Sequence, residues 1–95
     1  MTPATPEGTT PVWHLYVIRT EHRAELQAFL SARGIGTAIH YPVPVHMQPF
    51  YKDLGYGEGD FPVTEAYAPK ILSLPMYAEM TDAMVREVVA ALQEF

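Results

Sequence analysis

The hydrophobic pattern in the first half of the chain predicts a strand followed by a helix. Residues 13–19 are rich in aromatic and β-branched side chains, which is typical of a strand. Apolar groups fall on both faces of this segment, so the pattern favours a central strand. Residues 21–33 predict a helix capped by Thr20 and ended by Gly34. Its apolar stripe at i, i+3 and i+4 consists of Leu26, Phe29 and Leu30.

The second half of the chain predicts two further strands and three helices. In chain order these are a strand, two short helices, a strand and a final helix: 35–41, 46–54, 63–68, 71–74 and the residues after Thr81. The first of these strands is expected to end at Pro42 and Pro44, because proline lacks a backbone donor and fixes φ. Gly55 is the expected end of the helix over 46–54. Thr81 is the predicted cap of the final helix.

The order β-α-β-α-α-β-α predicts a small α/β (α+β) fold, a two-layer sandwich of a three-stranded sheet and packed helices. Residues 13–95 are expected to form this one domain, near the low end of domain size. Residues 1–12 are expected to be a flexible tail or linker. Their first eleven positions hold three prolines and four threonines and almost nothing apolar.

The charge balance argues against polyanionic partners. Six basic residues stand against eleven acidic ones, for a net charge of −5. Because Lys and Arg are not clustered, neither nucleic acid nor an anionic membrane surface is an expected partner. The absence of cysteine excludes disulfides and a thiol nucleophile. With no signal-peptide pattern and no long apolar run, the expected location is the cytoplasm.

Candidate chemistry concentrates in residues 34–46. His40 and Tyr41 precede a rigid proline-bearing stretch, and His46 follows it. Rigidity lowers the entropy cost of binding, which suits a recognition loop. The plainer interpretation is that the prolines only turn the chain and that the imidazoles bond to backbone. Spacing alone leaves both interpretations open.

Independent catalysis finds no support in the sequence. A metal site from His14, His40 and His46 is conceivable, but the spacing matches no compact ligand motif. The two serines, Ser31 and Ser73, stand in no nucleophile elbow, and no carboxylate is evidently paired with a histidine. The two lysines, Lys52 and Lys70, are expected to be solvated surface charges. No metal, cofactor or catalytic residue is therefore assigned to this chain.

Residues 13–95 contain an ordered series of motifs: His14–Arg19, Leu30–Thr37, His40–His46, Phe50–Tyr51, Gly59–Pro62, Glu65–Ala66 and Leu72–Tyr77. In sequence and order these motifs resemble those of the DegT/DnrJ-type (StrS-like) sugar aminotransferases. The His-Tyr-Pro-x-Pro-x-His run followed by Leu-Ser-Leu-Pro is the most specific of them. Residues 1–12 stand where the family has a large N-terminal domain.

The resemblance implies a function that this chain can perform only as part of a longer protein. Family members are pyridoxal-phosphate enzymes of aminotransferase fold type I that move an amino group from an amino acid onto a keto group of a nucleotide-linked sugar. Their large domain supplies the Schiff-base lysine, and the small C-terminal domain closes over an active site at a dimer interface. By resemblance, His40, Tyr41 and His46 face the substrate side and are the candidate substrate-binding residues.

Two hypotheses follow for the chain itself. In the first, it is the C-terminal domain of a nucleotide-sugar aminotransferase and is not catalytically competent alone. This hypothesis predicts an apolar face that a large domain covers, through which the isolated chain could form a homo-oligomer. In the second, it is a stand-alone, non-catalytic binding or interaction module that uses the same loop. Binding of a nucleotide sugar by the isolated chain distinguishes the two.

Overall fold

The computed structural model describes residues 1–95 and contains two strands, three α-helices and two short 3₁₀-helices. In chain order they are β1 (Tyr16–Arg19), α1 (Arg23–Ser31), η1 (Val45–Met47), η2 (Pro49–Leu54), α2 (Pro62–Tyr67), β2 (Ile71–Leu74) and α3 (Asp82–Glu94). The chain therefore has a mixed α/β fold, as predicted, but around a smaller sheet.

The two strands pair antiparallel and present two chemically different faces. The register sets Ile18 opposite Leu72 and Val17 opposite Ser73. Because side chains alternate along a strand, residues two apart share a face. The first face carries Tyr16, Ile18, Leu72 and Leu74. The second face carries Val17, Arg19, Ile71 and Ser73.

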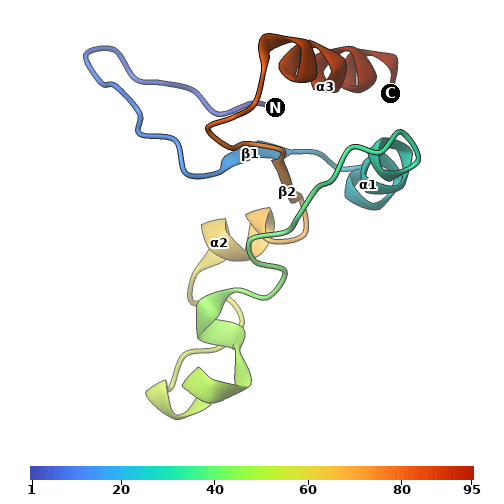
Figure 1. The fold of residues 1–95 in the computed structure, drawn as a ribbon. Coiled ribbons are helices and arrows are strands. Elements are labelled where there is room, and N and C mark those ends of the chain that lie inside the picture. The colour runs from blue at the N-terminus through green and yellow to red at the C-terminus, as the bar shows by residue number, and fades with distance from the viewer.

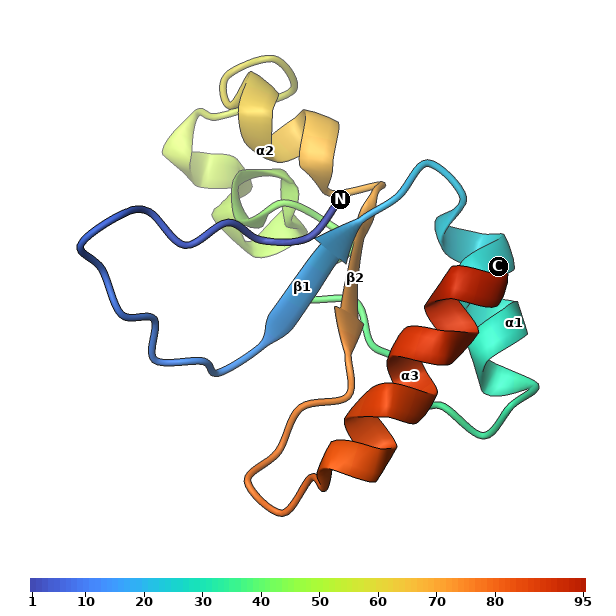
Figure 2. The same ribbon diagram turned by 90° about the horizontal axis from the view of Figure 1, so that it is seen from above.

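The first face of the sheet forms the core with α1 and α3. Figures 1 and 2 show α3 lying across this face, with α1 beside it. The buried cluster consists of Ile18, Leu26, Leu30, Ile35, Leu72, Val88 and Ala91. Burying a Leu-sized side chain stabilises the fold by about 1.5–3 kcal/mol. Since only nine of the 95 residues are buried, the core is small for the length of the chain.

The predicted third strand over residues 35–41 is wrong. Only Ala38 pairs with the sheet, through an isolated bridge in which it exchanges two backbone hydrogen bonds with Ser73, of 3.1 and 2.8 Å. Glycine at position 36 disfavours an extended ladder, and Pro42 offers no donor to continue one. The sheet therefore has two strands. β1 pairs with β2 alone, so the prediction that the first strand is central is also wrong.

The helix ends depart from prediction at α1 and agree with it at α3. The hydroxyl of Thr81 accepts a hydrogen bond from the backbone N–H of Met84, so Thr81 caps α3 as predicted. Thr20 does not cap α1, because its hydroxyl accepts from the N–H of His22, before the helix begins at Arg23. The helix predicted over 46–54 is two 3₁₀-helices, because Pro49 interrupts it.

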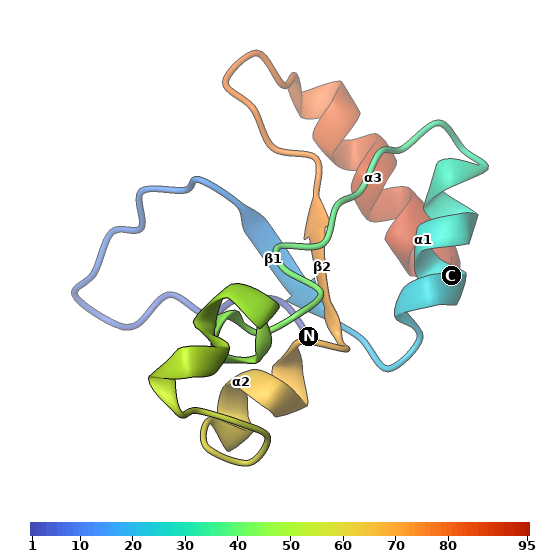
Figure 3. The ribbon, with the colours of Figure 1, turned by 90° about the horizontal axis from the view of Figure 1, so that it is seen from below.

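Residues 41–68, here called the arm, project away from the second face of the sheet. Figure 1 shows η1, η2 and α2 below the sheet, and Figure 3 shows the arm in front of it with α3 behind. A compact chain of this length has a radius of gyration of about 12 Å. The observed value is 15.7 Å, and the molecule measures 47 × 36 × 22 Å. The projecting arm contributes to this extended shape.

The N-terminal segment has no helix or strand over residues 1–12. Its first residue exchanges two backbone hydrogen bonds with Arg19, of 2.8 and 2.9 Å, along the outer edge of β1. None of the helices combines the length and the apolar character that a membrane-spanning segment requires.

Candidate functional site

His40 and Tyr41 lie where the chain leaves the sheet and enters the arm. The Nδ1 atom of His40 is hydrogen-bonded to the hydroxyl of Ser73, at 2.9 Å. Ser73 is buried on the second face of β2 and therefore ties the imidazole to the sheet. The rings of His40 and Tyr41 pack edge to face at a centroid distance of 5.4 Å, and the peptide bond between the two residues is cis.

A depression of about 330 Å³ separates the arm from the second face of the sheet. Its lining residues are His40, Tyr41, Val43, Pro44, Val45, Thr64, Tyr67, Ala68 and Ile71. No Asp, Glu, Lys or Arg lines it. Aromatic rings beside a few polar groups are suited to a ligand with an apolar face and hydroxyl groups, such as a sugar ring.

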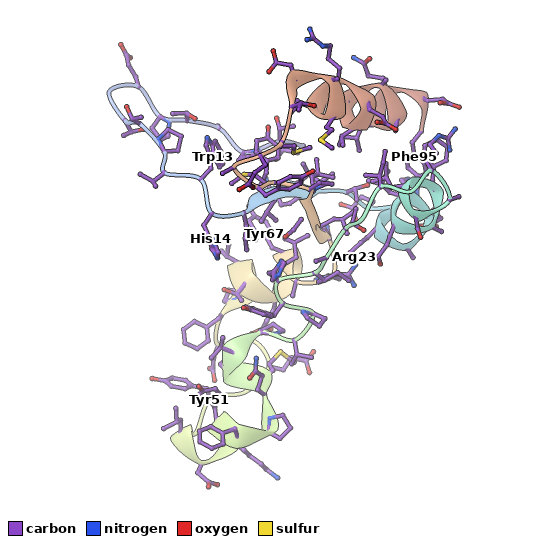
Figure 4. The ribbon with its side chains drawn as sticks, in the orientation of Figure 1. Trp13, His14, Arg23, Tyr51, Tyr67 and Phe95 are labelled. Carbon is purple, nitrogen blue, oxygen red and sulfur yellow. The ribbon has the colours of Figure 1, made fainter.

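Tyr67 forms one wall of this depression and is held from behind. The guanidinium carbon of Arg19 lies 4.0 Å from the centroid of the Tyr67 ring, within the range of a cation–π interaction. Figure 4 shows Tyr67 between the sheet and the arm, and Tyr51 towards the far end of the arm. Arg23 adds a second link, because its Nη1 donates to the carbonyl oxygen of Ala68 at 2.6 Å. Arg19 in β1 and Arg23 in α1 thus hold the C-terminal end of α2 against the rest of the molecule.

His46 is held inside the arm by Glu65. The Nε2 atom of His46 lies 3.0 Å from Oε1 of Glu65, and the side chains are 8% and 17% exposed. The ring of Phe61 packs on the imidazole at a centroid distance of 4.7 Å. His46 therefore offers a ligand much less surface than Tyr41, which is 66% exposed.

Glu65 also receives backbone donors from the loop that precedes α2. The N–H of Gly59 donates to Oε1 and Oε2, at 3.0 and 2.8 Å, and the N–H of Phe61 donates to Oε1 at 3.1 Å. The Gly59 hydrogen bond, followed by that of Phe61, lowers the pKa of Glu65 below its ordinary value of 4.5. Desolvation opposes this change, and His46 adds to it.

A second depression of about 440 Å³ adjoins the first, within the arm. It is lined by Val45, His46, Tyr51, Leu54, Tyr56, Phe61 and Thr64. Val45 and Thr64 line both depressions. They are the sequence neighbours of His46 and Glu65, so the His46–Glu65 pair lies directly beside the shared wall.

The structure brings together two of the three residues singled out from sequence. His40 and Tyr41 line the first depression, whereas His46 lines the second. The statement that no carboxylate is paired with a histidine is wrong, because Glu65 pairs with His46. Sequence reasoning also missed the roles of Ser73 and Glu65, although both lie in motifs that carry the family resemblance.

The Ser73–His40 pair has the distance of a nucleophile and its base, but not the other requirements. Ser73 is 3% exposed, and no carboxylate is hydrogen-bonded to His40. Glu65 pairs with the other histidine instead. The pair is therefore a structural contact between the sheet and the residue that precedes the arm.

The residues present do not fit a resident metal or pyridoxal phosphate. No group of three His, Asp or Glu side chains could hold a metal ion. An imine-forming lysine needs a free amine in a pocket. The Nζ atom of Lys70 is 2.8 Å from Oε1 of the exposed Glu21, and Lys52 is itself exposed. The cofactor that the resemblance implies would have to be held by other parts of a longer protein.

The chain resembles a defined part of several sugar aminotransferases. It is 44% identical over 93 residues to the dTDP-3-amino-3,4,6-trideoxy-alpha-D-glucose transaminase of Streptomyces venezuelae, covering 98% of the chain and 24% of that relative. It is 34% identical over 91 residues to the UDP-2-acetamido-2-deoxy-3-oxo-D-glucuronate aminotransferase of Pseudomonas aeruginosa, covering 96% and 24%.

The three-dimensional structure agrees with the sequence comparisons. The crystal structure of DesV from S. venezuelae, in complex with a ketimine intermediate, superposes with a TM-score of 0.90 at 44% identity. The match covers 98% of this chain and 25% of DesV. The chain thus spans about a quarter of the length of these relatives. Residues 1–93 match the pattern of the DegT/DnrJ/EryC1/StrS aminotransferase family, and the chain belongs to that family.

Proposed function

We propose that this chain is the substrate-side small domain of a nucleotide-sugar aminotransferase and transfers no amino group by itself. The observation that carries the proposal is the superposition of nearly the whole chain on one quarter of DesV. The two relatives described above are named as transaminases of dTDP-linked and UDP-linked sugars. A nucleotide-linked keto sugar is therefore the proposed acceptor, and pyridoxal phosphate is the proposed cofactor of the complete protein.

The exposed apolar surface of the arm supports the proposal that another domain covers this chain in the complete protein. Large apolar side chains lie in solvent along the arm, with Phe50 87% and Leu54 63% exposed. A soluble monomer rarely exposes extended apolar surface without a partner that covers it. The proposed cover is a cofactor-bearing domain of the same protein or of a second copy.

In the proposed reaction the chain binds and orients the sugar and excludes water from it. Bound pyridoxal phosphate supplies the chemistry of amino transfer, and its site lies outside this chain. His40 and Tyr41 present an imidazole and a phenol at the first depression, where they can hydrogen-bond sugar hydroxyls. Closing the arm over the sugar would remove it from water, which strengthens each polar contact.

A chimera in which this chain replaces the matching quarter of DesV tests the proposal. The expected result is amino transfer by the chimera and none by the isolated chain. Tyr41→Ala should raise KM at least about tenfold, because it removes binding contacts, whereas Tyr77→Ala, outside both depressions, should leave KM unchanged. A folded chimera that binds pyridoxal phosphate but transfers no amino group would refute the proposal. Nucleotide-sugar binding by the isolated chain would then favour the stand-alone module.

A further inference from the structure

The carboxylate of Glu65 joins η1 to the loop that immediately precedes α2. Its oxygens contact His46 in η1 and the N–H groups of Gly59 and Phe61 in the loop before α2. Glu65 itself belongs to α2. The arm contains no strand and contributes no residue to the buried core cluster. The contacts of Glu65 with His46, Gly59 and Phe61, here called the hub, link η1 to α2.

The chemistry of the hub fixes the state of the His46 imidazole. Backbone donors hold the pKa of Glu65 below its ordinary value, so the side chain is an anion near neutral pH. A carboxylate anion only accepts hydrogen bonds, and the proton between the two groups must therefore sit on Nε2 of His46. Glutamine at position 65 could still accept a hydrogen bond, but without the charge that strengthens all of these contacts.

The hub lies beside the wall of the first depression, which His40 and Tyr41 line. Val45 precedes His46, Thr64 precedes Glu65, and both neighbours line the depression that holds His40 and Tyr41. The His46–Glu65 hydrogen bond thus sets the separation of the two chain segments that form this wall. Any change in that separation alters the shape of the depression.

We propose that Glu65 is a positioning residue for the sugar site and that His46 acts through Glu65 rather than by touching the sugar. The expected effect on catalysis rests on the proposed function. The claim that the hub shapes the first depression does not, because it is argued only from contacts within the arm. Tyr41 and His40 are left as the residues that contact the sugar directly.

Nuclear magnetic resonance of the isolated 95-residue chain tests the hub without any ligand. In Glu65→Gln, the amide hydrogens of Gly59 and Phe61 should exchange at least about tenfold faster, since charge-assisted hydrogen bonds are lost. The preference of His46 for the Nε2–H tautomer should weaken, and the ring signals of His40 and Tyr41 should shift. Glu58→Gln is the matched control, because Glu58 is exposed in the same loop and makes no side-chain hydrogen bond or ion pair.

Unchanged His40 and Tyr41 signals in Glu65→Gln would overturn the proposal, even with faster exchange in the loop. Should that variant not fold, His46→Gln provides the second test, because its amide still donates to Glu65. In the DesV chimera, Glu65→Gln should raise KM more than it lowers kcat, and His46→Gln should raise KM less than Glu65→Gln does. A larger effect of His46→Gln would mean that the imidazole touches the sugar. An inactive wild-type chimera would refute the proposed function and leave the ligand-free result standing.

Discussion

Replacing Ser73 with alanine should weaken the contact that anchors His40, the residue before the arm, to the sheet. The variant removes the hydroxyl that lies 2.9 Å from Nδ1 of His40. Neutral hydrogen bonds contribute about 0.5–1.5 kcal/mol net, and His40 is only half-buried, so water can replace part of the contact. We therefore expect a loss of about 1 kcal/mol in the free energy of unfolding.

The chain offers a matched control, because Ser31 is its only other serine. Ser31 is exposed in the last position of α1, and its side chain makes no hydrogen bond. Ser31→Ala should change the free energy of unfolding by less than about 0.5 kcal/mol, since alanine is also the better helix former.

Urea denaturation and thermal denaturation, each monitored by circular dichroism, measure the stability of both variants. A loss of about 1 kcal/mol should lower the melting temperature by about 4–8 °C in a domain of this size. The His40 ring signals should move in Ser73→Ala and stay in place in Ser31→Ala. If the two variants unfold at the same urea concentration with unchanged His40 signals, the hydroxyl does not hold the imidazole, and the reasoning is refuted.

Three further predictions concern the core, a helix end and acid. Leu72→Ala should lower the free energy of unfolding, measured by urea denaturation, by about 2–5 kcal/mol because Leu72 is fully buried. Leu54→Ala, at an exposed site, should lower it by less than about 1 kcal/mol, and equal losses would contradict this account of the core. Thr81→Ala should lower the free energy of unfolding by about 1 kcal/mol, because the cap of α3 is lost, whereas Thr10→Ala should cause no measurable change. Urea denaturation followed through the helical circular dichroism signal measures both variants. The pKa of Glu65 is lowered on folding, so the contribution of Glu65 to the free energy of unfolding is complete above pH 4.5 and is lost as the pH falls through the folded-state pKa. Below pH 4.5 the free energy of unfolding should therefore fall less steeply with pH in Glu65→Gln than in the wild type. Identical curves for the two proteins would exclude this linkage.

Local signals in the sequence predicted the elements that depend on neighbouring residues. The strand Ile71–Leu74 and the Thr81 cap of α3 were both predicted correctly, because proline, the cap and apolar spacing act within a few positions. Pairing between distant segments was not predictable in this way. Residues 35–41 have the composition of a strand, yet only Ala38 meets a partner in the sheet.

In the candidate site too, contacts between sequence neighbours were predictable and contacts between distant residues were not. His40 and Tyr41 are adjacent in sequence and remain neighbours at one depression. His46 and Glu65 are nineteen positions apart, and no spacing rule connects a histidine in one 3₁₀-helix with a carboxylate in a later α-helix. The motif that contains Glu65 signalled family membership, but its contact with His46 appears only after the arm has folded back on itself.

The alternation of β2 divides the strand between two kinds of constraint. Leu72 and Leu74 face the core side, whereas Ile71 and Ser73 face the arm. The two faces of β2 therefore serve different parts of the structure, the buried core on one side and the contact with His40 on the other. A single-residue insertion or deletion within the strand would exchange the two faces, because it would turn leucines towards the arm and a serine into the core. Length variation among natural or designed versions of this domain should avoid these four positions and accumulate in the loop between η2 and α2.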